Sequence, residues 1–102
     1  MFAVTRLRAT GADGEALAAA VPGLLEALAG VPGFRGGEFG RCTEDPSLWA
    51  LVTLWEGVGA YRRGLSAAAV KIAGAPVWVH ALDEPGAYVP EGSAGLAGRR
   101  GD

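Results

Sequence analysis

Residues 48–56 form a segment that would be apolar on both faces of an extended chain. Successive side chains of a strand point to opposite faces. One face of this segment would carry Leu48, Ala50, Val52 and Leu54, and the other Trp49, Leu51, Thr53 and Trp55. An antiparallel strand with one face in water alternates apolar and polar residues instead. The segment therefore predicts a strand that is covered on both sides.

The hydrophobic periodicity around this segment predicts the element order βαββαβ. The expected elements are a strand at 2–8, a helix from Asp13 to about Gly30, strands at 34–43 and 48–56, helices at 58–65 and 66–73, and a strand at 76–83. The sequence Asp45-Pro46-Ser47-Leu48 fits a type I turn, which would join the two middle strands as antiparallel neighbours. This order is the ferredoxin-like α+β arrangement, with one antiparallel sheet of four strands.

The first helix has a clear apolar face and an internal proline. The apolar residues at helical spacing are Leu17, Val21, Leu24, Leu25 and Leu28. Asp13 is expected as the N-cap, because its carboxylate can accept hydrogen bonds from the free amides of the first turn. Pro22 removes one backbone hydrogen bond and clashes with the preceding turn. It predicts a kink, and two short helices with Pro22 in the first turn of the second are the alternative.

Length and composition bound the class of protein. A chain of 102 residues has room for one core, so we expect one domain over residues 1–88. A flexible C-terminal tail is expected over residues 89–102, which are rich in Gly, Ser and Arg. A net charge of −2 leaves no basic field for nucleic acid, and no apolar run approaches the roughly 20 residues of a membrane span.

The N-terminal residues favour a cytoplasmic protein. Residues 1–8 alternate like a strand, and they lack the basic start and the cleavage site of a signal peptide. Arginine far outnumbers lysine, while Ala, Gly and Pro are abundant, which indicates GC-rich codons and favours an actinobacterial source. We expect a soluble, cytoplasmic protein.

One histidine and one cysteine leave little material for metal or nucleophilic chemistry. His80 and Cys42 are too few to complete a zinc site, and a single cysteine excludes an internal disulfide. Cys42 is interpreted as a small residue at a strand end. The Gly-rich stretch 33–40 lies before and within a strand, whereas dinucleotide loops follow a strand and open a helix. We therefore expect no metal and no cofactor, and chemistry that depends on the substrate's own reactivity.

A second copy of the chain is the expected partner. The strands at 48–56 and 76–83 are both predicted to be apolar on both faces. The helices can cover only one face of the sheet, so the chain has nothing of its own for the other. The same face of another copy, packed as an isologous dimer, would cover it.

A recognisable set of residues surrounds the strand-to-helix junction at Trp55. It consists of Pro32-Gly33-Phe34 before a strand, Glu44-Asp45-Pro46 in a turn, Trp55 near a strand end and Tyr61-Arg62-Arg63 on the helix. This pattern resembles the corresponding junction of the antibiotic biosynthesis monooxygenases and their haem-degrading relatives. The resemblance implies a subunit that pairs through its sheet into a dimeric α+β barrel. Anthrone-type members are cofactor-independent oxygenases that bind flat polyketide aromatics between the helices and the sheet.

The resemblance also implies candidate catalytic residues. Trp55 matches a tryptophan of the pocket wall, and Tyr61 matches a tyrosine whose hydroxyl could donate to an oxygen intermediate. His80 is added because histidine titrates near neutral pH and could act as a base if it faces the pocket. Arg62 and Arg63 are interpreted as a solvated helix face.

Four positions differ from the relatives. Leu51 stands where anthrone oxygenases carry an asparagine, so a leucine replaces a group that could hold a developing oxyanion. The later arginine of these enzymes falls near Ala75. Thr5 and Leu65 stand where haem-degrading relatives carry an asparagine and a histidine. The expected substrate-binding residues are Thr5, Leu24, Leu51, Thr53, Trp55 and Leu65.

Three functions follow from these residues. The first is a cofactor-independent monooxygenase that acts on a hydrophobic aromatic or quinone-like small molecule, which Trp55 and Tyr61 favour. The second is a non-catalytic small-molecule-binding or accessory dimer with the same fold, which Leu51 favours. The third is a polyketide cyclase or isomerase that uses His80 as its base.

Overall fold

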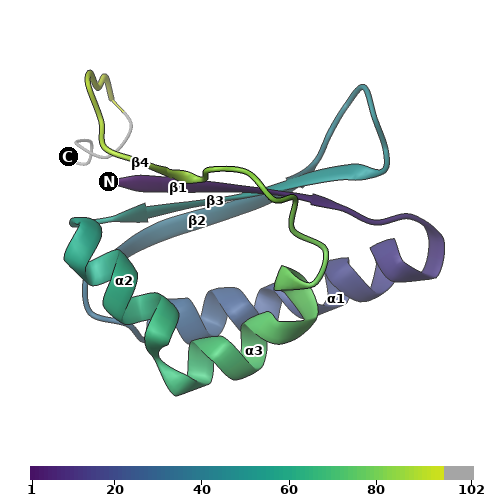
Figure 1. Ribbon diagram of the computed structural model, residues 1–102, viewed down its shortest axis with the longest axis horizontal. Helices are drawn as coiled ribbons and strands as arrows, with labels where there is room; N and C mark the ends of the chain where they lie inside the picture. The colour runs from purple at the N-terminus through teal and green to yellow at the C-terminus, as the bar shows by residue number, and fades with distance from the viewer. Residues whose placement is uncertain (96–102) are drawn as a thin grey trace.

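A four-stranded antiparallel sheet carries three helices on one of its faces (Figure 1). The computed structural model describes residues 1–95. The elements are β1 (Phe2–Arg8), α1 (Gly11–Ala29), β2 (Phe34–Arg41), β3 (Leu48–Trp55), α2 (Val58–Ser66), α3 (Ala68–Trp78) and β4 (Ala87–Tyr88). The strands lie in the order β2-β3-β1-β4. The predicted ferredoxin-like α+β fold is confirmed.

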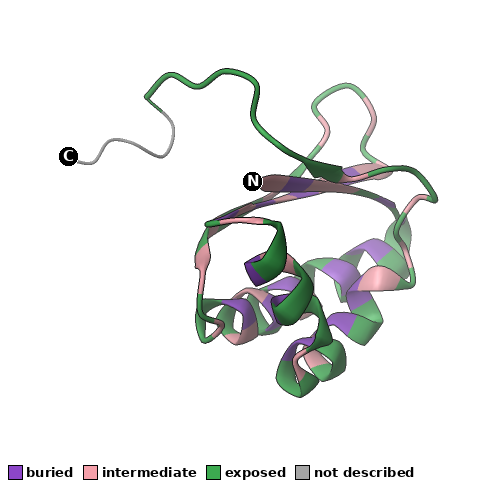
Figure 2. Cartoon of the chain, turned by 60° about the vertical axis from the view of Figure 1, so that its left-hand side comes forward, coloured by how far each residue is buried: buried purple, intermediate pink, exposed green. Residues whose placement is uncertain are grey.

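β3 is a central strand, paired along its length with β1 on one side and β2 on the other. The residues Trp49, Leu51, Thr53 and Trp55 face the helices and are buried. The residues of the opposite face, Leu48, Ala50, Val52 and Leu54, are only half-buried. Figure 2 shows that the helices lie on one side of the sheet only. We call the helix-covered side the closed face and the other side the open face.

α1 is one continuous helix of 19 residues, so the alternative of two short helices is wrong. Pro22 is tolerated because it lies on the exposed side, where water can bind the carbonyl of Ala18 that its missing N–H leaves free. The helix begins three residues earlier than predicted: the N-cap is Thr10, so the prediction of Asp13 as the N-cap is wrong, and Asp13 lies within the first turn. There its carboxylate still suits the positive end of the helix dipole.

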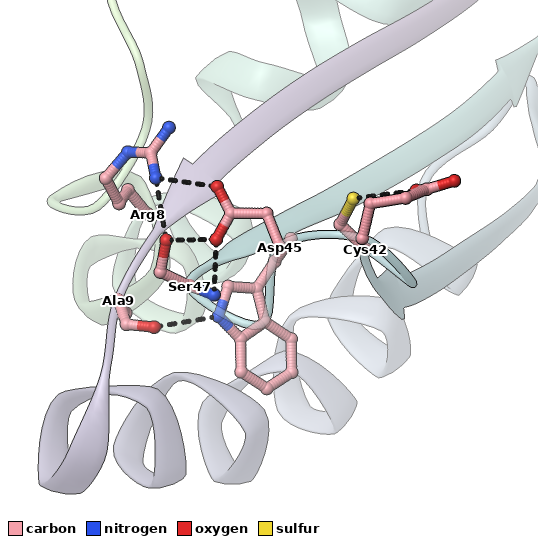
Figure 3. Close-up of polar contacts among 7 residues, drawn as sticks. Arg8, Ala9, Cys42, Asp45 and Ser47 are labelled. Carbon is pink, nitrogen blue, oxygen red and sulfur yellow. Dashed lines mark hydrogen bonds and ion pairs between the residues drawn. The ribbon is translucent and has the colours of Figure 1, made fainter.

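The side chain of Asp45 fixes the turn between β2 and β3 (Figure 3). The Leu48 amide donates to the Asp45 carbonyl at 3.0 Å, which is the bond expected of the predicted turn. One carboxylate oxygen of Asp45 accepts from the Ser47 amide at 3.0 Å and from the Ser47 hydroxyl at 2.7 Å, and the other accepts from Arg8 at 3.3 Å. These bonds hold the pKa of Asp45 below its ordinary value, and the Ser47 hydroxyl is the largest cause.

Asp45→Asn is expected to be less stable than the wild type at neutral pH, with a difference that shrinks in acid. A carboxyl group with a lowered folded-state pKa stabilises the fold above its unfolded-state pKa, and this contribution is lost as the pH falls through the folded-state pKa. Urea unfolding of both proteins between pH 7 and pH 3 measures the difference. A gap of constant size over this range would contradict the assignment.

α3 extends to Trp78, so the predicted helix end near Ala73 and the predicted strand at 76–83 are wrong. Val70, Gly74 and Val77 lie at helical spacing and are buried. Pro76 suggested a strand, but its missing N–H affects only the carbonyl of Ile72, a residue that is 76% exposed. The apolar pattern of 76–78 therefore belongs to a helix face. Residues 76–78 therefore give no evidence that the sheet is apolar on both faces.

After α3 the chain runs along the free edge of β1. Three backbone hydrogen bonds join the two segments, from Arg8 to His80 (2.9 Å), from Leu82 to Arg6 (2.8 Å) and from Val4 to Gly86 (2.7 Å). The Arg6 guanidinium also donates twice to the Glu84 carboxylate, each bond being 2.7 Å long. The fourth strand of the ferredoxin-like order thus exists, but it lies at 87–88 and follows an irregular edge segment.

Beyond β4, residues 89–95 are exposed and form no helix or strand. The rest of the expected tail, residues 96–102, lies outside the described residues, so the domain boundary at residue 88 stays a prediction. None of the helices within residues 1–95 combines the length and the hydropathy of a membrane span.

Candidate functional site

A cavity of about 500 Å³ lies between the closed face of the sheet and the helices. Its size falls in the usual range of small-molecule pockets, about 300–1,000 Å³. β1 and β3 form one wall, and α2 and α3 form most of the other. The lining residues are Ala3, Thr5, Leu28, Leu51, Thr53, Trp55, Tyr61, Leu65, Lys71, Ala75 and Trp78.

Most of the residues proposed from the sequence meet on this wall. Strand register places Thr5 opposite Leu51, two pairs along the ladder from Thr53 and its partner Ala3, so both pairs lie on the same face. Trp55 ends the same strand, and α2 adds Tyr61 and Leu65. The alternation of β3 explains the arrangement, because every second side chain points toward the helices.

Two of the proposed residues lie elsewhere. Leu24 is 0% exposed and packs in the core, and the residue of α1 that reaches the cavity is Leu28, one turn later. His80 lies beyond the end of α3, where its carbonyl accepts a hydrogen bond from the Arg8 amide. It does not line the cavity. The geometry therefore gives no support to His80 as a base for a substrate in this cavity.

Trp55 forms a fixed part of the wall. Its side chain is 2% exposed, and its indole Nε1 donates to the Thr53 hydroxyl at 2.9 Å. Phe34 and Tyr61 each pack edge-to-face against the ring, with centroids 5.2 and 5.7 Å away. On α2, Gly64 leaves space for the ring, since a Cβ there would lie 2.5 Å from the nearest ring atom. Contacts on these sides hold the indole in one orientation.

Tyr61 of α2 is one of the residues that line the cavity. It is only partly buried, and its ring packs against Trp55 from α2. Within residues 1–95 its hydroxyl has no hydrogen-bond partner. The group is therefore available to donate a hydrogen bond to a bound molecule.

Sequence reasoning missed Lys71 and Trp78. Both lie on α3, and together with Ala75 they follow the helical spacing i, i+4, i+7. The signal was present, but the predicted helix ended near Ala73 and put Trp78 into a strand. The Trp78 indole lies directly against Gly74, where a Cβ would be 2.3 Å from its Nε1. Glycines of α2 and α3 thus seat the two tryptophans of the cavity.

Among the described residues, one charged side chain lines the cavity. Lys71 is the only charged residue among those that line the cavity, and no carboxylate lies there. The carboxyl groups with a lowered pKa lie elsewhere. Besides Asp45, they are Glu44, whose pKa is lowered by the Thr43 side chain and Cys42, and Glu84, whose pKa is lowered by the Arg6 guanidinium. Within residues 1–95 no group of three His, Cys, Asp or Glu side chains could hold a metal ion.

Comparisons with known proteins agree with this architecture. The chain resembles SnoaB, a cofactor-independent oxygenase from Streptomyces nogalater, with a TM-score of 0.78 and 17% identity over 90% of this chain and 93% of that chain. It also resembles a putative antibiotic biosynthesis monooxygenase from Chloroflexus aurantiacus J-10-fl, with a TM-score of 0.71 and 24% identity over 92% and 95% of the two chains. A search of curated proteins gave no match. The model of the antibiotic biosynthesis monooxygenase family matches residues 1–73. Because this match covers most of the chain, the protein belongs to the antibiotic biosynthesis monooxygenase family.

Proposed function

We propose that this protein is a cofactor-independent monooxygenase that acts on a hydrophobic aromatic or quinone-like small molecule. The observation that carries the proposal is the cavity of about 500 Å³, whose wall holds the fixed indole of Trp55 beside the unpaired hydroxyl of Tyr61. A flat ring can pack against the aromatic wall, while the hydroxyl binds an oxygen atom at its edge. The similarity in fold to SnoaB, an oxygenase of this kind, supports the same reaction class.

The proposed reaction uses electrons from the substrate. An anthrone that has lost a proton is electron-rich enough to react with dioxygen; one oxygen atom becomes the new ring carbonyl and the other leaves as water. The protein supplies orientation and a site shielded from bulk water. The Tyr61 hydroxyl donates a hydrogen bond to the negative oxygen that develops.

Tyr61→Phe is expected to lower kcat for oxygen uptake with anthrone by about a hundredfold, the usual effect of losing one donor to a developing oxyanion. The ring of Phe keeps the edge-to-face contact with Trp55, so ligand binding should change little. Oxygen-electrode kinetics measure the effect. Tyr88→Phe is the matched control, because Tyr88 stacks on Phe2 away from the cavity. Equal rates in the two variants would remove Tyr61 from the mechanism, and wild-type uptake at the protein-free rate would reject anthrone oxygenation.

A non-catalytic binding protein is the second candidate. Leu51 is 1% exposed on the cavity wall, and its side chain offers no hydrogen bond to an oxyanion. Quenching of tryptophan fluorescence by aromatic ligands, without oxygen uptake above background, would favour this candidate over the oxygenase.

We also propose that the protein works as a homodimer that pairs through the open face. This face carries Phe2 and Val4 of β1 beside Val52 and Leu54 of β3 in register. It also holds a second hollow of about 410 Å³, whose lining includes the apolar residues Leu48, Ala50 and Val52 and the charged residues Arg6, Glu38 and Arg41. An apolar sheet face of this kind is larger than the patches that monomers commonly expose. An identical face on a second copy would cover it symmetrically.

Val52→Glu is expected to convert the dimer to a monomer at micromolar concentration. Val52 lies on the open face opposite Val4, and in a dimer its replacement would bury an unpaired carboxylate. Light scattering coupled to size-exclusion chromatography measures the mass. Ile72→Glu is the control, since Ile72 is exposed on α3, on the helix side of the sheet. A wild-type protein that is already monomeric would refute the proposal.

A further inference from the structure

The cavity carries one positive charge that the proposed chemistry has not yet used. Lys71 lines it from α3, one turn before Ala75. Lys71 lines the cavity and is exposed as a whole residue, so the residue lies where the cavity opens to solvent, at its mouth. Ala75 is small and leaves the space next to it open.

The Lys71 ammonium has no partner among the residues that the structure describes. The ion pairs found within residues 1–95 are Arg6 with Glu84 and Arg8 with Asp45, and neither includes Lys71. The Lys71 side chain makes no hydrogen bond to another residue of the described range 1–95. A surface lysine usually finds its partner in water, but this one borders a cavity that is mostly apolar.

The other polar groups of the wall include three that can donate a hydrogen bond, two of which are hydroxyls that can also accept one. Tyr61 and Thr5 contribute hydroxyls, and Trp78 contributes an indole N–H. The Thr53 oxygen already accepts from Trp55. With a cation at the mouth and no carboxylate on the wall, the site favours a ligand that brings acceptor oxygens and negative charge.

We propose that Lys71 binds an ionised ring oxygen of the aromatic ligand, so that the cavity selects hydroxyaromatic molecules as phenolates or enolates. This inference rests on the proposed function in one respect: the ionised form is also the form that gives electrons to dioxygen. Lys71 is then a residue that determines specificity and favours the reactive ionisation state. The proton lost by the ligand goes to solvent water at the mouth.

The test uses 2-hydroxyanthraquinone, whose absorbance moves to longer wavelength when the hydroxyl ionises. An opposite charge a few ångströms away lowers a pKa by about one unit or more. The bound dye is therefore expected to ionise at a pH about one unit lower in the wild type than in Lys71→Met. Affinity for the ionised dye should fall about tenfold in that variant. Lys71→Arg should restore most of both effects.

The controls separate local from general charge effects. Arg62→Met removes the same charge from an exposed residue that does not line the cavity, so the wild-type titration should persist. Binding of uncharged 2-methylanthraquinone should change less than about twofold in Lys71→Met, since no charge pair is lost. Identical titration of the bound dye in the wild type and Lys71→Met would overturn the proposal, and so would failure of the wild type to bind the ionised dye at millimolar concentration.

One further arm tests the chemistry of the anion. If anthraquinone-2-carboxylate depends on Lys71 while the ionised hydroxyl does not, the ring oxygen is the wrong ligand and the proposal fails. Because these measurements need no turnover, they are independent of oxygen uptake. A protein that binds the phenolate through Lys71 but consumes no oxygen would keep this inference and refute only the proposed oxygenase.

Discussion

Trp55→Ala is expected to lower the free energy of unfolding by about 3–5 kcal/mol, the usual range for deleting a buried aromatic side chain. The indole is 2% exposed, and it packs against Phe34 of β2 and Tyr61 of α2. It also donates to Thr53, whose buried hydroxyl would lose its partner. Since small domains unfold with a total of about 5–15 kcal/mol, this one change removes a large share of the stability.

Urea denaturation followed by circular dichroism measures this loss. Trp78→Ala is the comparison, because that indole also lines the cavity but is only partly buried, and its loss should cost less. Both variants should bind aromatic ligands more weakly. If Trp55→Ala were no less stable than Trp78→Ala, the description of Trp55 as the fixed part of the wall would be wrong.

Gly64→Ala is expected to cost roughly 1–2 kcal/mol and to weaken ligand binding. The added methyl group would lie 2.5 and 2.7 Å from two ring atoms of Trp55, with Val31 at 3.2 Å on another side. Overpacking of this kind costs about 1–3 kcal/mol, while alanine in a helix regains up to about 1 kcal/mol relative to glycine. The ring must move, and the direction left to it is the cavity. Denaturation and ligand titration measure the two effects.

Gly23→Ala is the matched control for this substitution. Gly23 also lies within a helix, but a Cβ there meets nothing within 4 Å. It should stabilise the protein by about 0.5–1 kcal/mol through helix propensity and leave ligand binding unchanged. A Gly64→Ala protein that gained stability as Gly23→Ala does would show that the Trp55 ring moves aside without cost.

The strand wall of the cavity is the part of the site that the sequence could predict, and β3 shows why. Its strict alternation identified both faces, and the register with β1 then places Thr5, Leu51 and Thr53 together on the cavity wall. Alternation in a strand is a local property that a sequence shows directly. Which face the helices would cover is a tertiary property, and the sequence left it undecided.

The second half of the helix wall could not be predicted in the same way. Residues 76–78 contain a proline followed by large apolar residues, a pattern that fits a strand as well as a buried helix face. Packing against α1 decides for the helix, with Val70 and Val77 fully buried. With Trp78 predicted in a strand, no helical spacing relates it to Lys71 and Ala75. The sequence therefore does not predict that Lys71 brings a positive charge to the cavity. His80 was predicted within the strand at 76–83 for the same reason, whereas it lies beyond the end of α3.

The break between α2 and α3 has a consequence for motion. Ala67 is extended there, and the two helices it separates have nine and eleven residues. Helices of this length are marginal on their own in water, so α2 depends on its contacts with β2, β3 and α3, and α3 depends on its contacts with α1 and α2. Amide hydrogens of α2 and α3 should therefore exchange with solvent sooner than those of β1 and β3. A ligand that bridges Tyr61 on one helix and Lys71 on the other would slow this exchange in both.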